Sequence, residues 1–345
     1  MEKRVICPAC GAAMKDPERC GSCGLSPAEI ACFADQTALA LWKAIYVPPK
    51  PTADKLLILS QNKLAVLNPR THALTLFNQF ERMLTMENVR QFSMSAAHWA
   101  ALMLDGHVEA EGDDTYQQCA VKDLAEVSFV HAADACTLLV QAGRVIVRGY
   151  CIFEKALSAW TDIVQVVLGE KHAAGLKKDG SVIIAAADSA PQALRAHPLS
   201  APQGDYIRTY HAPDTWRDVI ALEAGDNYIL GLTRDGRALA LGESSGEPLS
   251  LDWKEPIVSI AAAKDHSLGL TAGGTLLIAG KTRTRSRFGG NLAAAVEGWN
   301  QLRAIGASGG VAAAVTAQGE LRLAGRPAYA ALPSSPDWDS RLLDS

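Results

Sequence analysis

The sequence predicts a mainly β protein: a seven-bladed β-propeller closed by its C-terminal strand and preceded by a small zinc ribbon and one α-helix. Three observations predict this fold. A strand-turn-strand phrase recurs along the chain, a short apolar strand precedes most of its copies, and two Cys-x2-Cys pairs stand near the N-terminus. We expect the zinc ribbon over residues 1–25, the helix over 26–46, a linker over 47–53 and the propeller over 54–345.

The ribbon is predicted from CPACGAAMKDPERCGSCG, in which the paired cysteines are Cys7, Cys10, Cys20 and Cys23. Zinc binds four thiolates at the corners of a tetrahedron, and each Cys-x2-Cys pair supplies two of them. Four protein ligands fill the coordination shell, so we expect one structural Zn²⁺ ion and no catalysis at this site. The segment resembles the short zinc ribbons that begin many bacterial proteins.

A helix is predicted after the ribbon because Ser26 and Glu29 form a capping box and Pro27 occupies the first helical position. The polar stripe of this helix is narrow, so more than one of its sides needs to be covered. It either docks on the propeller or contacts another chain. The proline-rich segment that follows, 47–53, is expected to be a stiff linker.

The repeated phrase consists of a strand, a tight turn and a second strand. Asp-Gly, Gly-Gly and Asn-containing turns suit the positive φ values of type I′ hairpins. One further copy, at 55–68, has Asn62–Lys63 at its turn, so we count seven copies. In the other six copies the glycines at the turn are Gly106, Gly143, Gly180, Gly236, Gly274 and Gly319.

A short apolar strand precedes the hairpin in six of the copies. In four copies it follows a tryptophan, namely Trp160, Trp216, Trp253 or Trp299. Each unit therefore contains at least three strands within about 40 residues, which is typical of propeller blades. The predicted strands lie within residues 89–96, 125–133, 163–170, 219–224, 257–263 and 302–307.

Ring closure is predicted from the two ends of the repeat region. The hairpin at 55–68 has no strand before it, whereas Trp338 and the apolar residues after it resemble the start of another copy with no hairpin. We expect residues 338–344 to complete the first blade by lying beside 55–68. A closed ring also leaves no long sheet edge exposed to aggregation.

This pattern resembles the regulator of chromosome condensation repeat. The matching features are the strand after the tryptophan, the His-x-x-x-x-Leu runs at His172 and His266, the Asp-Gly or Gly-Gly turn, and a glycine that closes most copies, such as Gly149. The resemblance covers roughly residues 54–345. It implies a seven-bladed propeller and a role as a protein-binding platform, a module beside a ubiquitin-ligase domain, or a nucleotide-exchange factor for a small GTPase.

Two segments are candidate binding regions. In KTRTRSR the basic residues Lys281, Arg283, Arg285 and Arg287 alternate, so an extended chain would direct them to one side, where they could bind phosphates or an acidic surface. The second candidate is the proline-rich insertion 187–215, which contains Arg208 and Tyr210. The alternatives are a solvated basic loop within 281–298 and an inert insertion.

Three histidines share one position, eight residues before the turn glycine: His98, His172 and His266. Residues that recur once per blade are too far apart to form one catalytic set. We therefore expect them to make hydrogen bonds within their own blades.

Composition and motifs favour a binding protein over an enzyme. The net charge of −4 is unsuited to a general phosphate-binding surface. We see no signal peptide, no apolar run of the ~20 residues that span a bilayer, and no disulfide-type cysteine spacing, so we expect a cytoplasmic protein without membrane contact. No nucleophile elbow, phosphate loop or His-Glu-x-x-His motif occurs.

The leading hypothesis is a non-enzymatic scaffold for protein–protein interaction that uses a propeller face, with the zinc ribbon as an accessory contact. One alternative is nucleic-acid binding through the ribbon and the basic loop 281–287. The other is regulation of a small GTPase by nucleotide exchange.

Overall fold

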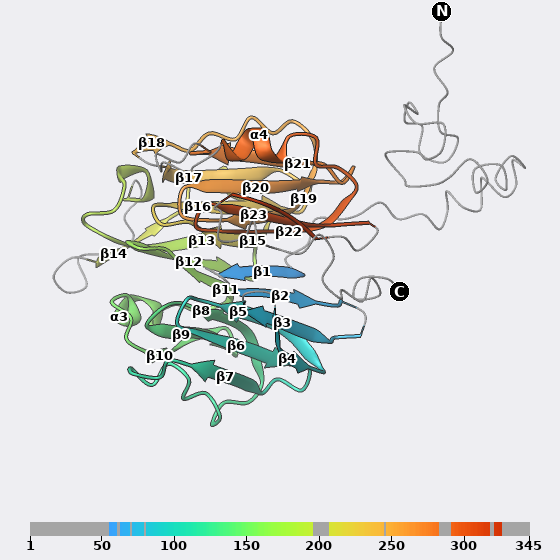
Figure 1. Cartoon of the computed structure of the whole chain (residues 1–345). Coiled ribbons are helices and arrows are strands. Elements are labelled where there is room, and N and C mark those ends of the chain that lie inside the picture. The colour runs from blue at the N-terminus through green and yellow to red at the C-terminus, as the bar shows by residue number, and fades with distance from the viewer. Residues whose placement is uncertain are drawn as a thin grey trace, which may run out of the picture.

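The computed structural model describes residues 55–60, 63–69, 71–78, 81–195, 207–244, 246–282, 291–317 and 321–325. In these residues the chain forms seven antiparallel sheets of three or four strands (Figure 1). The predicted zinc ribbon, helix and linker, and the tail after residue 325, lie outside the described residues.

The first four sheets follow one another along the chain. Sheet 1 contains β1 (Leu57–Ser60), β2 (Lys63–Leu67), β3 (Leu74–Asn78) and β4 (Glu81–Met86). Sheet 2 contains β5 (Val89–Met94), β6 (His98–Met103) and β7 (Val108–Gly112). Sheet 3 contains β8 (Val127–Ala132), β9 (Cys136–Gln141) and β10 (Arg144–Gly149). Sheet 4 contains β11 (Ile163–Leu168), β12 (His172–Lys177), β13 (Val182–Ala187) and β14 (Ile207–His211).

The last three sheets have the same antiparallel order. Sheet 5 contains β15 (Val219–Ala224), β16 (Tyr228–Thr233), β17 (Ala238–Ser244) and β18 (Glu247–Pro248). Sheet 6 contains β19 (Ile257–Ala262), β20 (His266–Thr271) and β21 (Leu276–Gly280). Sheet 7 contains β22 (Leu302–Ser308), β23 (Val311–Thr316) and β24 (Leu321–Ala324). The short helical turns α3 (Glu154–Leu157) and α4 (Leu292–Val296) lie between successive sheets, and η1 (Gln192–Arg195) lies between β13 and β14 of sheet 4.

The sheets are arranged around a common centre. The first strand of each sheet, here called the inner strand, contacts the inner strand of the next sheet, and β22 of sheet 7 contacts β1 of sheet 1. Figure 1 shows β1 beside the strands of the last sheet. Apolar side chains fill the space between neighbours, for example Leu57 and Leu59 of sheet 1 against Val311 and Val315 of sheet 7. The predicted mainly β, propeller-like architecture is thus confirmed.

The repeated glycines fix each sheet to the next one. Gly180 has a φ of +80°, and its carbonyl accepts a hydrogen bond of 3.2 Å from the Val219 N–H at the start of the following inner strand. A Cβ on Gly180 would lie 3.0 Å from the Asp218 Cα. Gly106, Gly143, Gly236 and Gly274 accept the same bond at 2.8 to 3.0 Å.

The first copy of the repeat is shifted by one strand from its predicted position, because the hairpin at 55–68 consists of β1 and β2. His72 has a φ of 57°, and its carbonyl accepts a 2.9 Å hydrogen bond from the Val89 N–H, as the turn glycines do in later sheets. The equivalent hairpin is therefore β2–β3, and β1 is the inner strand. Because β1 already holds the position expected for residues 338–344, the circle of contacts needs no strand from the tail, which lies outside the described residues.

In sheets 4 to 6, the recurrent tryptophan that precedes the inner strand packs over a glycine of the second strand. Trp160 lies over Gly175, where an added Cβ would be 2.7 Å from the indole. Trp216 and Trp253 occupy the same place against glycines of β16 and β20. The small residue leaves room for the ring, which explains why the tryptophan and the glycine recur together.

Candidate functional site

A cavity of about 360 Å³ lies at the centre of the molecule and is lined by the inner strands of all seven sheets. The inner strands of sheets 2–7 share an irregularity, because their pairing register shifts after the first residue, as between Val89 and Gln91. Such a bulge bends the strand and redirects the following side chain. The third residue of an inner strand is thereby available for contact with the neighbouring sheet.

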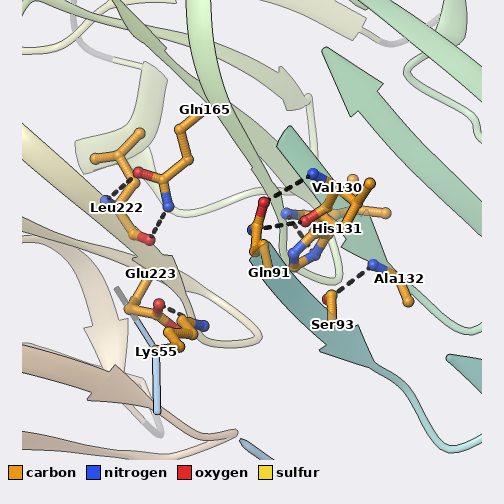
Figure 2. A network of polar contacts seen from close by, with 10 residues as sticks. Lys55, Gln91, Ser93, Val130, His131, Ala132, Gln165, Leu222 and Glu223 are labelled. Atoms are coloured by element: carbon orange, nitrogen blue, oxygen red, sulfur yellow. Dashed lines mark hydrogen bonds and ion pairs between the residues drawn. The ribbon is translucent and has the colours of Figure 1, made fainter. Parts of the chain in front are cut away.

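Two glutamines use this position to bind the next sheet. Gln91 of β5 donates from Nε2 to the Val130 carbonyl at 3.0 Å and accepts the Val130 N–H at 3.2 Å (Figure 2). Gln165 of β11 makes the same pair of bonds with Leu222 of β15, at 2.7 and 2.9 Å. Each amide therefore satisfies one donor and one acceptor on an edge strand that has no backbone partner on that side.

The fifth residue of the inner strand makes a similar contact. The Ser93 hydroxyl accepts the Ala132 N–H at 2.9 Å, and His131 Nε2 accepts the Leu168 N–H at 3.3 Å. Burial lowers the pKa of His131 to about 3, so the ring is neutral and its Nε2 is free to accept. These polar side chains hold neighbouring sheets together.

The ion pair between Lys55 and Glu223 spans the cavity wall between sheets 1 and 5, which are not neighbours (Figure 2). Glu223 is 8% exposed, and its carboxylate also accepts a backbone hydrogen bond from Ala262. Burial raises the pKa of Glu223, and the Lys55 ammonium opposes that rise. The pair therefore connects Lys55, just before β1, to β15 on the opposite side of the ring.

The recurrent histidines are buried, but they do not follow the prediction in full. His98 contacts Ser95 of its own sheet at 3.4 Å and reaches Thr137 of the next sheet through Nε2 at 2.7 Å. Burial lowers the pKa of His172 to about 4, and the backbone of Tyr228 in the next sheet opposes that fall. The Ser95 contact of His98 agrees with the expected bond within its own blade, whereas the bond to Thr137 links His98 to the next sheet.

Two faces can be defined from the strand order. Face A carries the loops between the first and second strands of each sheet, and face B carries the turns between the second and third strands. The third strands also end on face A, since the Asp113 N–H donates to Ala97 and the Tyr150 N–H donates to Ala135.

Of the candidate binding residues, Lys281 is exposed on face A, where its N–H donates to the Asp265 carbonyl at 2.7 Å. Arg208 lies on β14, 3.5 Å from the Asp188 carboxylate. Tyr210 is 3% exposed and belongs to the core, so its ring offers no surface to a partner. Cys7, Cys10, Cys20, Cys23, Arg283, Arg285 and Arg287 lie outside the described residues.

The sequence reasoning missed an exposed apolar cluster on face A. Tyr116, Tyr150 and Ile152 are 54%, 61% and 51% exposed, and the two tyrosine rings lie 5.9 Å apart. The available signal was a pair of aromatic residues just after the glycines that close sheets 2 and 3, where polar loop residues are the rule.

The described residues contain no group of three or more His, Cys, Asp or Glu side chains placed to hold a metal ion. Among the helices in that part of the chain, none is long and apolar enough to cross a membrane.

No family model matches the chain, and no curated protein is similar to it in sequence. Solved structures do match the fold. The CRINKLY WD40 ectodomain of the Arabidopsis thaliana receptor kinase ACR4 superimposes with a TM-score of 0.56 at 16% identity, covering 79% of this chain and 94% of that one. The ectodomain of the Physcomitrella patens receptor kinase CR4 gives 0.54 at 13% identity, covering 79% and 73%.

Yeast RCC1 (Prp20), in its structure bound to Kap60, gives a TM-score of 0.53 at 17% identity and covers 72% of this chain and 73% of that one. The resemblance to the regulator of chromosome condensation repeat is supported at the level of the fold. At these identities the likeness concerns the fold alone.

Proposed function

We propose that the protein is a non-enzymatic scaffold for protein–protein interaction, built as a seven-bladed propeller that uses one face. The observation that carries the proposal is that polar side chains at the centre bind neighbouring sheets, which leaves the loop faces to contact a partner. Gln91, Gln165 and Glu223 at the centre are engaged in bonds between sheets, whereas exposed tyrosines gather on a loop face. Exposed apolar clusters of this kind mark interaction sites.

The likeness to yeast RCC1 supports the same reading, because that propeller was solved in complex with the protein Kap60. A rigid ring suits binding since its loops are held in place before the partner arrives, which lowers the entropic cost of association. The zinc ribbon at Cys7, Cys10, Cys20 and Cys23 would add an accessory contact, with one Zn²⁺ ion supplying structure.

Nucleic-acid binding through the ribbon and the basic loop 281–287 is less favoured. Face A, which carries Lys281, also carries the exposed carboxylates of Asp113, Asp114 and Glu170. These carboxylates repel a phosphate backbone.

The test is affinity capture from the native host with the full-length protein, its Cys7→Ser/Cys10→Ser variant and its Lys281→Ala/Arg283→Ala variant. We expect a protein partner that the intact chain and the Lys281 variant both retain. The cysteine variant should lose bound zinc, measured on the same sample by elemental analysis, and retain the partner more weakly.

Capture that depends on nucleic acid, falls steeply with salt and is lost in the Lys281 variant would contradict the proposal and favour the alternative. Faster nucleotide release from a small GTPase in the presence of the protein would favour the exchange-factor alternative instead.

A further inference from the structure

The exposed cluster of Tyr116, Tyr150 and Ile152, here called the tyrosine patch, lies where sheets 2 and 3 meet on face A. Tyr150 and Ile152 alternate with the buried residues Cys151 and Phe153, so the backbone that supports them is anchored in the core. Tyr116 is fixed from the other side, because its N–H donates to the Gln118 side chain at 2.8 Å. The patch is therefore pre-formed.

Carboxylates flank the patch on both sheets. Asp113 and Asp114 precede Tyr116, while Asp134 lies in the loop whose Ala135 carbonyl binds the Tyr150 N–H. Within the described residues none of these three carboxylates takes part in an ion pair.

One cation of this surface, Arg148, is already engaged. The Arg148 guanidinium already donates to the Ala120 carbonyl and to the Asp123 carboxylate, each at 2.8 Å. The pKa of the nearby Cys119 thiol is raised by burial first and then by Asp114 and Asp113, as expected beside a negative surface.

Asp113 accepts hydrogen bonds from Thr115 and Gln118, and Asp114 accepts one from the Cys119 N–H, so these carboxylates are held in place without a cation. Aromatic rings beside such carboxylates suit arginine better than lysine. The guanidinium of arginine is flat, stacks on a tyrosine face and can bind a carboxylate through two parallel N–H groups. A lysine ammonium is a more strongly hydrated point charge and gains less from the ring. The patch consists of only three side chains, which suits a short segment better than a large globular surface.

We propose that the tyrosine patch binds an extended, arginine-bearing segment of a protein partner, an inference that rests on the proposed scaffold function. Arginine stacks on Tyr116 or Tyr150 in this arrangement, and the flanking carboxylates receive its N–H groups. We choose a basic segment as the partner because its positive charge complements the carboxylates beside the patch.

The experiment measures binding of two fluorescent peptides to the full-length protein by anisotropy. Arginine alternates with serine in one peptide, and lysine replaces arginine in the other. We expect the arginine peptide to bind several-fold more tightly, Tyr150→Ser to weaken it about tenfold, and Asp113→Asn/Asp114→Asn to reduce both its affinity and its salt dependence. Leu104→Ser is the matched control, because Leu104 is 47% exposed on face B.

Thermal melting of each variant checks that the fold is intact. Equal binding of the two peptides, or binding unchanged by Tyr150→Ser, would overturn the inference. Self-association of the protein alone that Tyr150→Ser abolishes would assign the patch to a second copy and also overturn it. If the partner captured from the host is retained by Tyr150→Ser, the scaffold function stands and only this inference fails.

Discussion

Single residues in unusual backbone conformations set the geometry of the ring. Turn residues with positive φ let the carbonyl of one sheet reach the first N–H of the next, and this contact recurs from Gly106 to Gly274. Glycine adopts that conformation at little cost, whereas other residues are strained in it. His72 occupies the equivalent position in sheet 1, so that copy lacks the glycine that marks the turn in the later sheets.

Gly180→Ala is predicted to destabilise the protein by about 3 kcal/mol, because it combines an unfavourable φ with contact against the Asp218 backbone. Gly246→Ala is the control: its φ of +86° is similar, but nothing lies within 4 Å of an added Cβ. The control should cost only about 1 kcal/mol. Urea denaturation measures both changes, and equal losses would show that the contact between sheets is unimportant.

At the scale of elements, the sequence pattern predicted most of the strands. The hairpins from β6–β7 to β20–β21 and the inner strands from β5 to β22 lie where periodicity and turn chemistry placed them. The polar bonds between sheets were not predicted, because Gln91 or Gln165 in an apolar strand has the same pattern whether its amide faces solvent or a neighbouring backbone. Likewise, burial of Tyr210 depends on the pairing of β14 with β13, which the sequence does not reveal.

Gln165→Met is predicted to lower the free energy of unfolding by about 2 kcal/mol, since it leaves both the N–H and the carbonyl of Leu222 without their side-chain partner. Gln141→Met makes the same change at an exposed site, where Nε2 donates to the Ala125 carbonyl. It should cost less than about 0.5 kcal/mol. Similar values for the two variants would refute a special role for the bonds between inner strands.

At the scale of the whole molecule, neighbour-to-neighbour contacts hold the ring, and an ion pair among the described residues crosses it. The Lys55–Glu223 ion pair joins sheets 1 and 5, which are not neighbours in the ring. Removing the cation would leave a buried carboxylate without its partner, the situation in which an ion pair matters most.

Lys55→Met is predicted to destabilise the protein more at about pH 8 than at about pH 5. Burial raises the pKa of Glu223 in the folded state, so the stability associated with the protonated carboxyl is present at low pH and is lost as pH rises through that pKa. We expect a loss of about 1–2 kcal/mol at the higher pH, because Lys55 is partly exposed.

Adding Glu223→Gln should restore most of the stability at high pH. The control is Lys264→Met, which breaks the exposed pair with Asp226 at 2.8 Å and should change stability little at either pH. Urea titrations at both pH values measure the free energies of unfolding. A loss of stability in Lys55→Met that does not grow with pH would contradict the proposed role of the Lys55–Glu223 pair.

The contact between β1 and β22 has a consequence for synthesis of the chain. Leu57 and Leu59 can pack against Val311 and Val315 only after sheet 7 has left the ribosome. Until then the growing protein is an open arc whose two ends expose apolar surface. We therefore expect the circle of contacts to close only after sheet 7 has been made, and the partly synthesised chain to be prone to aggregation until then.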